Sequence, residues 1–383
     1  MISFLDKIRG NQLPLRYFID VAKWKLYQKT GRRSRGIFSI RSSRRAIIIH
    51  ETDSLCLTQI FPFFYYRKEI ESRFKVRLSF QAKSDFLAFP ERSLRGVPLV
   101  ILQSWYTTPD DILNSLLHSS KLLNPDAKIV FLDAMSPTDL RLAHHLSDKI
   151  DLYVKKHILR DRNQYGKPTR GDTNLTDFYM KQYGISGLET THPVSANFLN
   201  KILIGPSFFT TPRLLGHFKF NLNPDRGDKA IDVHGRMTHA KNDWYGIMRQ
   251  EAKSKLEQIQ GIKIVSEPNV SPTQYLLELR NSKICFSPFG YGEGCHRDYE
   301  AVYGGALLLK PDMAHIQTNP DIFIPFKTYV PIDWRFIDLE AKVRHYLHHA
   351  VERRELIENA YGVLHRYCHS DYFLDQMKPI FDA

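Results

Sequence analysis

The segment 283–311 constrains the fold of this chain more than any other part of the sequence. Its apolar run 284–286 is typical of a strand that is buried on both faces of a parallel sheet. Ser287 and Pro288 end that run, and the apolar residues 306–309 predict a second buried strand soon afterwards. Two such strands joined by a short helix indicate an α/β fold with a parallel sheet.

Glycines and charged residues fill the space between these two strands. Gly290, Gly292 and Gly294 predict a turn with positive φ angles and a backbone that a ligand can approach closely. The charged residues that follow within one or two helical turns are Glu293, His296, Arg297, Asp298 and Glu300. We therefore expect charged groups at the carboxyl edge of the sheet, where open α/β folds bind their ligands.

The same residues carry a resemblance to a known family. This segment resembles the donor-binding motif of exostosin-like and related bacterial GT-B glycosyltransferases. The matching parts are, in order, Ser-Pro, the glycine-rich turn, Arg297-Asp-Tyr-Glu300-Ala301, Gly-Gly-Ala and a strand ending in Lys310-Pro311. The resemblance covers roughly a third of the chain, residues 231–346. It implies an α/β fold of two Rossmann-like domains facing a cleft, and an enzyme of polysaccharide biosynthesis that uses a nucleotide-sugar as its donor.

The resemblance also assigns roles to single residues. It implies that Glu300 holds the ribose hydroxyls of the donor, that Arg297 reaches its diphosphate or sugar, and that Gly292 belongs to the donor-binding loop. Glu293 becomes a candidate catalytic carboxylate. Retaining GT-B enzymes often carry two glutamates separated by seven residues, whereas six separate Glu293 and Glu300, which favours an inverting reaction. The simpler alternative is that the glycines only connect strand and helix, with Arg297 and Glu300 as a solvated pair.

Stabilisation of the leaving diphosphate requires a divalent metal or cationic groups. The chain contains no Asp-x-Asp triplet, so we expect no metal and assign the task to positive side chains. Arg236, after the first strand of the second half, is the best placed, and Lys241 and Lys310 are further candidates, whereas Arg249 lies farther along the next helix.

An inverting transferase also needs a base that removes the proton of the acceptor hydroxyl. Asp133 ends the apolar run 128–132 and is the first candidate. His50, Glu51 and Asp139 are alternatives, and aspartate is also a common turn residue.

Strands and helices alternate along both halves of the chain. The first half predicts strands at 45–50, 76–80, 97–102, 128–132 and 151–154, and helices at 54–72, 110–123 and 138–146. The second half predicts strands at 230–234, 262–265, 284–286 and 306–309, a helix at 242–258 capped by Asn242, and a helix opened by Ser271-Pro272. Residues 160–196 interrupt the pattern and suit a cleft or an interdomain crossing.

These patterns divide the chain into a basic arm (1–44), an acceptor domain (45–200), a donor-binding domain (201–345) and a helical tail (346–383). The resemblance implies that the tail packs back on the first domain, as is common in GT-B proteins.

The net charge of +13 is concentrated near the N-terminus. Residues 13–27 predict a helix with an aromatic face and a basic flank. Residues 1–45 are therefore a candidate for contact with an anionic membrane surface, and the alternative is that the aromatic face packs on the body of the protein. A second basic cluster, Lys155 to His157 with Arg160 and Arg162, suits an acidic acceptor or a solvated surface.

Composition limits the remaining possibilities. No apolar window is long enough to cross a bilayer, and four scattered cysteines suit reduced thiols, so we expect a cytoplasmic protein. The basic N-terminal segment adds peripheral attachment to the inner membrane face as an option. The expected partners are a nucleotide-sugar and a glycan or lipid-linked oligosaccharide acceptor. The alternatives are a nucleic-acid-binding protein, motivated by the basic pI, and a catalytically inactive nucleotide-sugar-binding scaffold. Because no nucleic-acid-binding motif is evident, no nucleic-acid partner is expected.

Overall fold

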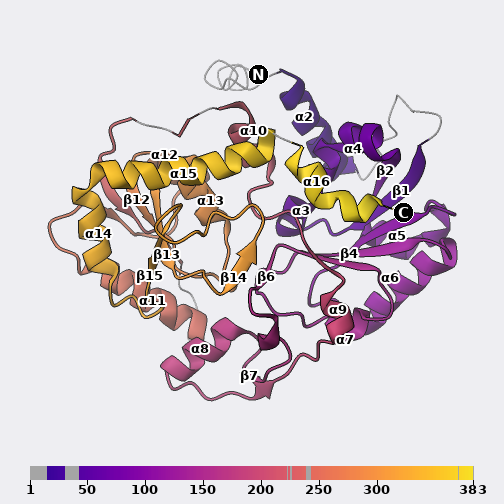
Figure 1. The fold of residues 1–383 in the computed structure, drawn as a ribbon, viewed down its shortest axis with the longest axis horizontal. Helices are drawn as coiled ribbons and strands as arrows, with labels where there is room; N and C mark the ends of the chain where they lie inside the picture. Colours follow the sequence, from indigo (N-terminus) through magenta and orange to yellow (C-terminus); the bar gives the residue numbers. More distant parts are fainter. Residues whose placement is uncertain are drawn as a thin grey trace.

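Two parallel sheets, each covered by helices, form the two halves of the molecule (Figure 1). The computed structural model describes residues 15–30, 43–221, 223–224, 227–238, 243–369 and 371–382. The expected α/β fold with two Rossmann-like domains is confirmed.

The first domain is built on six parallel strands whose apolar residues are mostly buried, except in one edge strand, Ile202–Ile204, where they are partly exposed. In spatial order they are β2 (Val76–Ala82), β1 (Arg44–His50), β3 (Leu99–Gln103), β4 (Lys128–Asp133), β5 (Leu152–Lys155) and β9 (Ile202–Ile204). The last strand lies a few residues beyond the domain boundary expected at residue 200.

Short helices and turns connect these strands. They are α3 (Ser54–Tyr65), α4 (Arg67–Phe74), α5 (Lys83–Ala88), α6 (Asp110–Leu123), α7 (Ala143–Leu146), α8 (Asn174–Gln182) and α9 (Ala196–Leu199), with 3-10 turns at Pro90–Arg92 and Arg162–Gln164. The helix predicted at 138–146 is wrong for its first half. There the carboxylate of Asp139 accepts hydrogen bonds from the backbone and guanidinium of Arg141, and this local pairing replaces helical bonds.

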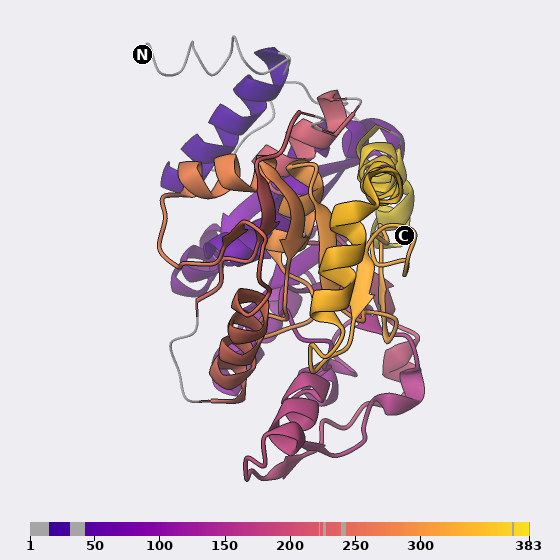
Figure 2. The ribbon, with the colours of Figure 1, turned by 90° about the vertical axis from the view of Figure 1, so that its left-hand side faces the viewer.

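The second domain repeats the architecture with five parallel strands. They are β11 (Ile264–Val265), β10 (Ile231–His234), β12 (Ser282–Phe286), β13 (Leu307–Pro311) and β15 (Val330–Ile332). The helices of this half are α10 (Pro212–Phe220), α11 (Trp244–Glu257), α12 (Pro272–Arg280), α13 (His296–Tyr303), α14 (Leu339–His348) and α15 (Ala350–His369). Figure 2 shows these strands between α12 on one side and α14 and α15 on the other.

Side-chain caps explain where two of these helices begin. Ser271 accepts a hydrogen bond from the backbone N–H of Gln274, as its sequence position before Pro272 predicts. The cap of α11 is Asp243, which accepts from Gly246, and not the predicted Asn242, which lies outside the described residues.

Residues 160–196 leave the first sheet and return to it, because β9 after them pairs with β5 of the first domain. The chain therefore passes to the second domain only after β9, and not within residues 160–196. Next to them, β6 (His157–Leu159) pairs antiparallel with β14 (Ile316–Thr318) of the second domain at the centre of Figure 1. Helix α8 lies between two short strands, β7 (Thr169–Arg170) and β8 (Glu189–Thr190), which pair antiparallel with each other. The helix contacts α11 of the second domain.

Both ends of the described chain pack on the first domain. Helix α16 (Tyr372–Phe381) crosses back from the second domain to the first. On the first domain, Phe373 stacks on Tyr66 and Phe381 stacks on Phe74. Helix α2 (Leu15–Thr30) buries Trp24 and Tyr27 against α3. The aromatic face of α2 therefore packs on the body of the protein, which is the alternative to a membrane-facing role for that face.

Within the ranges that the structure describes, no helix combines the length and apolar character needed to cross a bilayer.

Candidate active site

The glycine-rich loop and the start of α13 lie at the carboxyl edge of the second sheet. The carboxylate of Asp298 accepts hydrogen bonds from the Cys295 backbone N–H (2.9 Å) and the Ser287 hydroxyl (2.7 Å). The buried ammonium of Lys310 lies 3.1 Å from the same carboxylate. Lys310, a predicted donor-binding residue, is thus paired with Asp298 and holds the first turn of α13 in place.

Gly292 approaches the backbone of the opposite domain. A Cβ atom built at this position would lie 2.3 Å from the carbonyl carbon of Ser136 and 2.6 Å from the nitrogen of Pro137. The expectation of positive φ is wrong for Gly290, Gly292 and Gly294, since the positive-φ glycines of the described chain lie elsewhere. The absence of a side chain at Gly292 serves contact between the domains.

Glu293 fastens this loop to the first domain. Its Oε1 accepts a hydrogen bond from the Thr138 hydroxyl at 3.0 Å, and its two oxygens lie 3.6 Å from Nε2 of His157 and 3.7 Å from Nε2 of His315. Burial alone would raise the pKa of Glu293, but the two histidines outweigh burial and lower the pKa well below its ordinary value. The predicted catalytic carboxylate therefore lies buried in an interdomain contact.

Arg297 carries a buried positive charge with few partners. Its Nε and Nη1 atoms are buried and have no hydrogen-bond partner among the residues described. Both ring nitrogens of His234, the last residue of β10, are likewise unpaired within the described chain, and burial followed by Arg297 lowers the pKa of His234 to about 4. A neutral imidazole and a guanidinium with free donors are suited to binding an anion.

Arg249 adds a second guanidinium to this region. Its Nε and Nη1 donate only to the backbone carbonyls of Phe289 (3.3 Å) and Thr238 (3.2 Å), and its guanidinium lies over the ring of Tyr245. Burial and the charge of Arg297 lower the pKa of Arg249. Two buried cations that repel each other in this way favour an anionic ligand between or beside them.

Glu300 and Arg297 do not form the solvated pair that was the simpler alternative. Glu300 forms an ion pair with Arg213 at the start of α10, whereas Arg297 faces Tyr275 of α12 and His234. The two residues of the sequence motif thus diverge from α13 toward different neighbours, and the carboxylate of Glu300 remains partly exposed.

The structure pairs Arg236 more fully than the sequence suggests. Its guanidinium donates to both carboxylate oxygens of Glu278 on α12, at 2.6 and 3.0 Å, and to the carbonyl of Glu267. In this arrangement its charge is neutralised by Glu278. Lys241, which was also predicted to bind the diphosphate and follows β10 in the sequence, lies outside the described residues.

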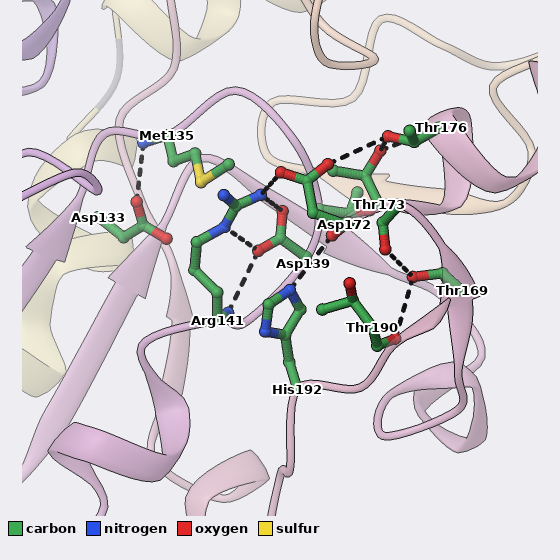
Figure 3. A network of polar contacts seen from close by, with 12 residues as sticks. Asp133, Met135, Asp139, Arg141, Thr169, Asp172, Thr173, Thr176, Thr190 and His192 are labelled. Atoms are coloured by element: carbon green, nitrogen blue, oxygen red, sulfur yellow. Dashed lines mark hydrogen bonds and ion pairs between the residues drawn. The ribbon is translucent and has the colours of Figure 1, made fainter. Parts of the chain in front are cut away.

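Asp133, the first candidate for the base, is buried at the end of β4 (Figure 3). One oxygen accepts from Tyr153 (2.6 Å) and Lys155 (2.5 Å), and the other accepts from the backbone of Met135 (2.7 Å). A carboxylate with all of these partners suits a positioning role.

The three alternative bases are also engaged. His50 bonds to Tyr27 and to the backbone of Glu51, the carboxylate of Glu51 accepts from Lys83, and Arg141 binds Asp139 as Figure 3 shows.

His296, the first residue of α13, is a site residue that the sequence did not single out as a base. It lines a cavity between the domains. Burial, followed by the charges of Lys156 and Arg213, lowers its pKa to about 4. The imidazole is therefore neutral at neutral pH and keeps one unprotonated ring nitrogen.

The basic cluster at 155–157 is buried and not solvated. Lys156 Nζ lies 3.8 Å from the ring centroid of Phe208 and 3.4 Å from the Thr58 hydroxyl, and no described carboxylate lies within ion-pair distance. Burial, only partly opposed by distant acidic groups, lowers the pKa of Lys156 to about 7.

Replacing Lys156 with Met is expected to raise the thermal midpoint, and to raise it more at about pH 6 than at about pH 9. In the unfolded chain this lysine has an ordinary pKa of about 10.4, whereas in the native protein its pKa is about 7. Between about pH 7 and about pH 10.4 the unfolded chain therefore binds more protons than the native protein. Wild-type stability therefore rises with pH across this window, and the burial penalty is full below it. The matched control is Lys181→Met at an exposed position. A lower midpoint for Lys156→Met at both pH values would contradict the assignment of a costly buried ammonium.

Comparison with known proteins gives results at the level of the fold. No family model and no curated protein matches the sequence. An α-glucosyltransferase in complex with UDP is similar in structure, with a TM-score of 0.52 and 10% identity over 89% of this chain and 100% of that chain. A glycosyltransferase from Rickettsia africae ESF-5 is also similar, with a TM-score of 0.51 and 10% identity over 88% of this chain and 98% of that chain. The chain has the GT-B fold, the two-domain architecture that these glycosyltransferases share.

Proposed function

We propose that the protein is a glycosyltransferase that takes a sugar from a nucleoside diphosphate donor. The observation that supports this most is the set of buried, unpaired nitrogen donors of Arg297 and His234 beside Arg249, in a GT-B fold, at the carboxyl edge of the second sheet. A diphosphate would supply the charge and the acceptors that these donors lack. The similar α-glucosyltransferase is in complex with UDP, so UDP-sugars are the first donors to test. The finer exostosin-like relation rests on the sequence motif alone.

In the proposed reaction the diphosphate leaves without help from a metal. The acceptor oxygen attacks the anomeric carbon, the bond from that carbon to the diphosphate oxygen breaks, and the nucleoside diphosphate leaves with the electron pair. Arg297, Arg249 and the N-terminus of α13 would bind the developing charge, and Glu300, once released from Arg213, would hold the ribose.

The proton of the acceptor hydroxyl needs a base on the side opposite the leaving group for an inverting outcome. We propose His296 for this role in place of Asp133, because His296 is neutral and lines the interdomain cavity, whereas both oxygens of Asp133 are bonded. The proposed acceptor is a surface glycan or a lipid-linked oligosaccharide, which would place the enzyme at the cytoplasmic face of a membrane.

A panel of sugar nucleotides tests this function by the release of nucleoside diphosphate. We expect slow hydrolysis of one donor, most simply a UDP-sugar, with an undiminished rate in EDTA because cationic side chains replace a metal. Loss of release in EDTA would refute metal independence only. A complete lack of binding and release across the panel would refute the proposed function and favour a scaffold.

A further inference from the structure

An apolar cavity of about 520 Å³ opens between the two domains beside the start of α13. Tyr17 and Val21 of α2, Leu55 and Thr58 of α3, Pro212 of α10 and His296 contribute to its lining. Its volume falls within the range of small-molecule sites, about 300 to 1,000 Å³. Helix α2, the N-terminal element of Figure 2, thus forms one wall of this space.

The lysine and arginine that line this cavity are cationic, and one of them, Arg213, is ion-paired with Glu300 behind the lining. Lys25 and Arg213 line it, and no acidic residue of the described chain is among its lining residues. Behind the wall, the fully buried Lys156 lies 3.4 Å from the hydroxyl of Thr58. An apolar chamber with cations at its border is complementary to an amphiphile that carries a negative head.

The cavity reaches both the protein surface and the proposed reaction centre. Leu55 is 38% exposed, so the apolar lining continues to the outside of the molecule. At the inner end, His296 directly precedes Arg297 in the chain. A molecule held here would place a polar group near the neutral imidazole that we propose as the base.

We propose that this cavity binds the apolar part of the acceptor, and that the acceptor is an amphiphile with a phosphate-bearing head near Lys25 and Arg213. This inference rests on the proposed transferase function and narrows its acceptor to the lipid-linked class. Helix α2 then acts as a wall of the acceptor site, in addition to packing on the first domain.

Decyl phosphate, below its micelle concentration, is the probe for this site in calorimetric titrations of the full chain. We expect it to bind at least about ten-fold more tightly than inorganic phosphate, because burial of the alkyl chain adds favourable free energy. Val21→Asp and Leu55→Asp should each weaken decyl phosphate binding by about ten-fold or more, since each places a carboxylate in the apolar lining. Leu55 is partly exposed, so its variant tests the site even if Val21→Asp fails to fold. The matched control is Leu122→Asp, at a 70% exposed position of α6, which should bind as the wild type does.

Parallel titration of UDP separates the two proposals. A wild type that binds UDP but binds decyl phosphate no better than inorganic phosphate overturns the cavity assignment alone. Binding of neither ligand would count against the proposed function as well. Displacement of decyl phosphate by UDP would place the nucleotide in the cavity. Binding of a short duplex DNA more tightly than decyl phosphate, with that binding lost in Leu55→Asp, would assign the cavity to a nucleic acid. Either result overturns the lipid assignment.

Discussion

Replacing Arg297 with methionine is expected to weaken UDP binding by about 100-fold, or about 2.7 kcal/mol, without unfolding the protein. Two nitrogens of this guanidinium, Nε and Nη1, are buried at the start of α13 and lack hydrogen-bond partners in the described chain. Charge-assisted hydrogen bonds to a diphosphate are worth about 1.5 to 3 kcal/mol each, so the loss of two accounts for the predicted effect.

The stability of the unliganded Arg297→Met protein should remain near that of the wild type. Removal of a buried charge with unsatisfied donors relieves a desolvation cost, and methionine fills much of the space of the arginine stem. Calorimetry with UDP and thermal unfolding without it measure the two effects separately. The control is Arg335→Met, which removes an exposed ion pair with Asp333. Wild-type affinity in Arg297→Met would refute its role as a diphosphate ligand.

Substitution of Gly292 by alanine is expected to lower the catalytic efficiency toward the identified donor by about 100-fold or more. A Cβ at this position would lie 2.3 Å from the backbone of Ser136, and a backbone segment cannot move aside as a flexible side chain would. The two domains must therefore separate locally, which also strains the contact of Glu293 with Thr138. A displacement of the order of 1 Å is enough to misalign groups supplied by opposite domains.

Gly290→Ala is the matched control two residues away. Its added Cβ would meet the nearest atom, the carbonyl oxygen of Gly292, at 3.5 Å, which is an ordinary contact. We expect its activity to remain within about two-fold of the wild type, because this substitution leaves the interdomain contact in place. Equal activity of the two alanine variants would show that close approach at Gly292 has no part in catalysis.

Local sequence patterns predicted much of the architecture. The strand at 128–133 and the helix Asp110–Leu123 follow from a buried apolar run and from periodic leucines behind a proline. The return of α16 to the first domain was predicted from the family resemblance. The N-terminal helix was predicted by its aromatic periodicity, but only packing against α3 decides which way that face points.

The details of the site were harder to predict because they depend on partners that are distant in sequence. Arg236 follows its strand as expected, but Glu278, its partner, lies 42 residues away. For Lys155 and Lys156 the sequence left a solvated surface cluster as one interpretation, yet both are buried. Lys155 pairs with Asp133, and the ammonium of Lys156 lies over the ring of Phe208. His234 ends β10, so its position at a strand terminus was the available signal that it belongs to the ligand-binding edge.

The central claim is that the protein binds the diphosphate of an activated sugar at the start of α13. A crystal structure of the full chain with UDP tests it most directly. The account predicts phosphate oxygens within hydrogen-bond distance of the Arg297 guanidinium and the ribose beside Glu300. A nucleotide bound away from both side chains would contradict it.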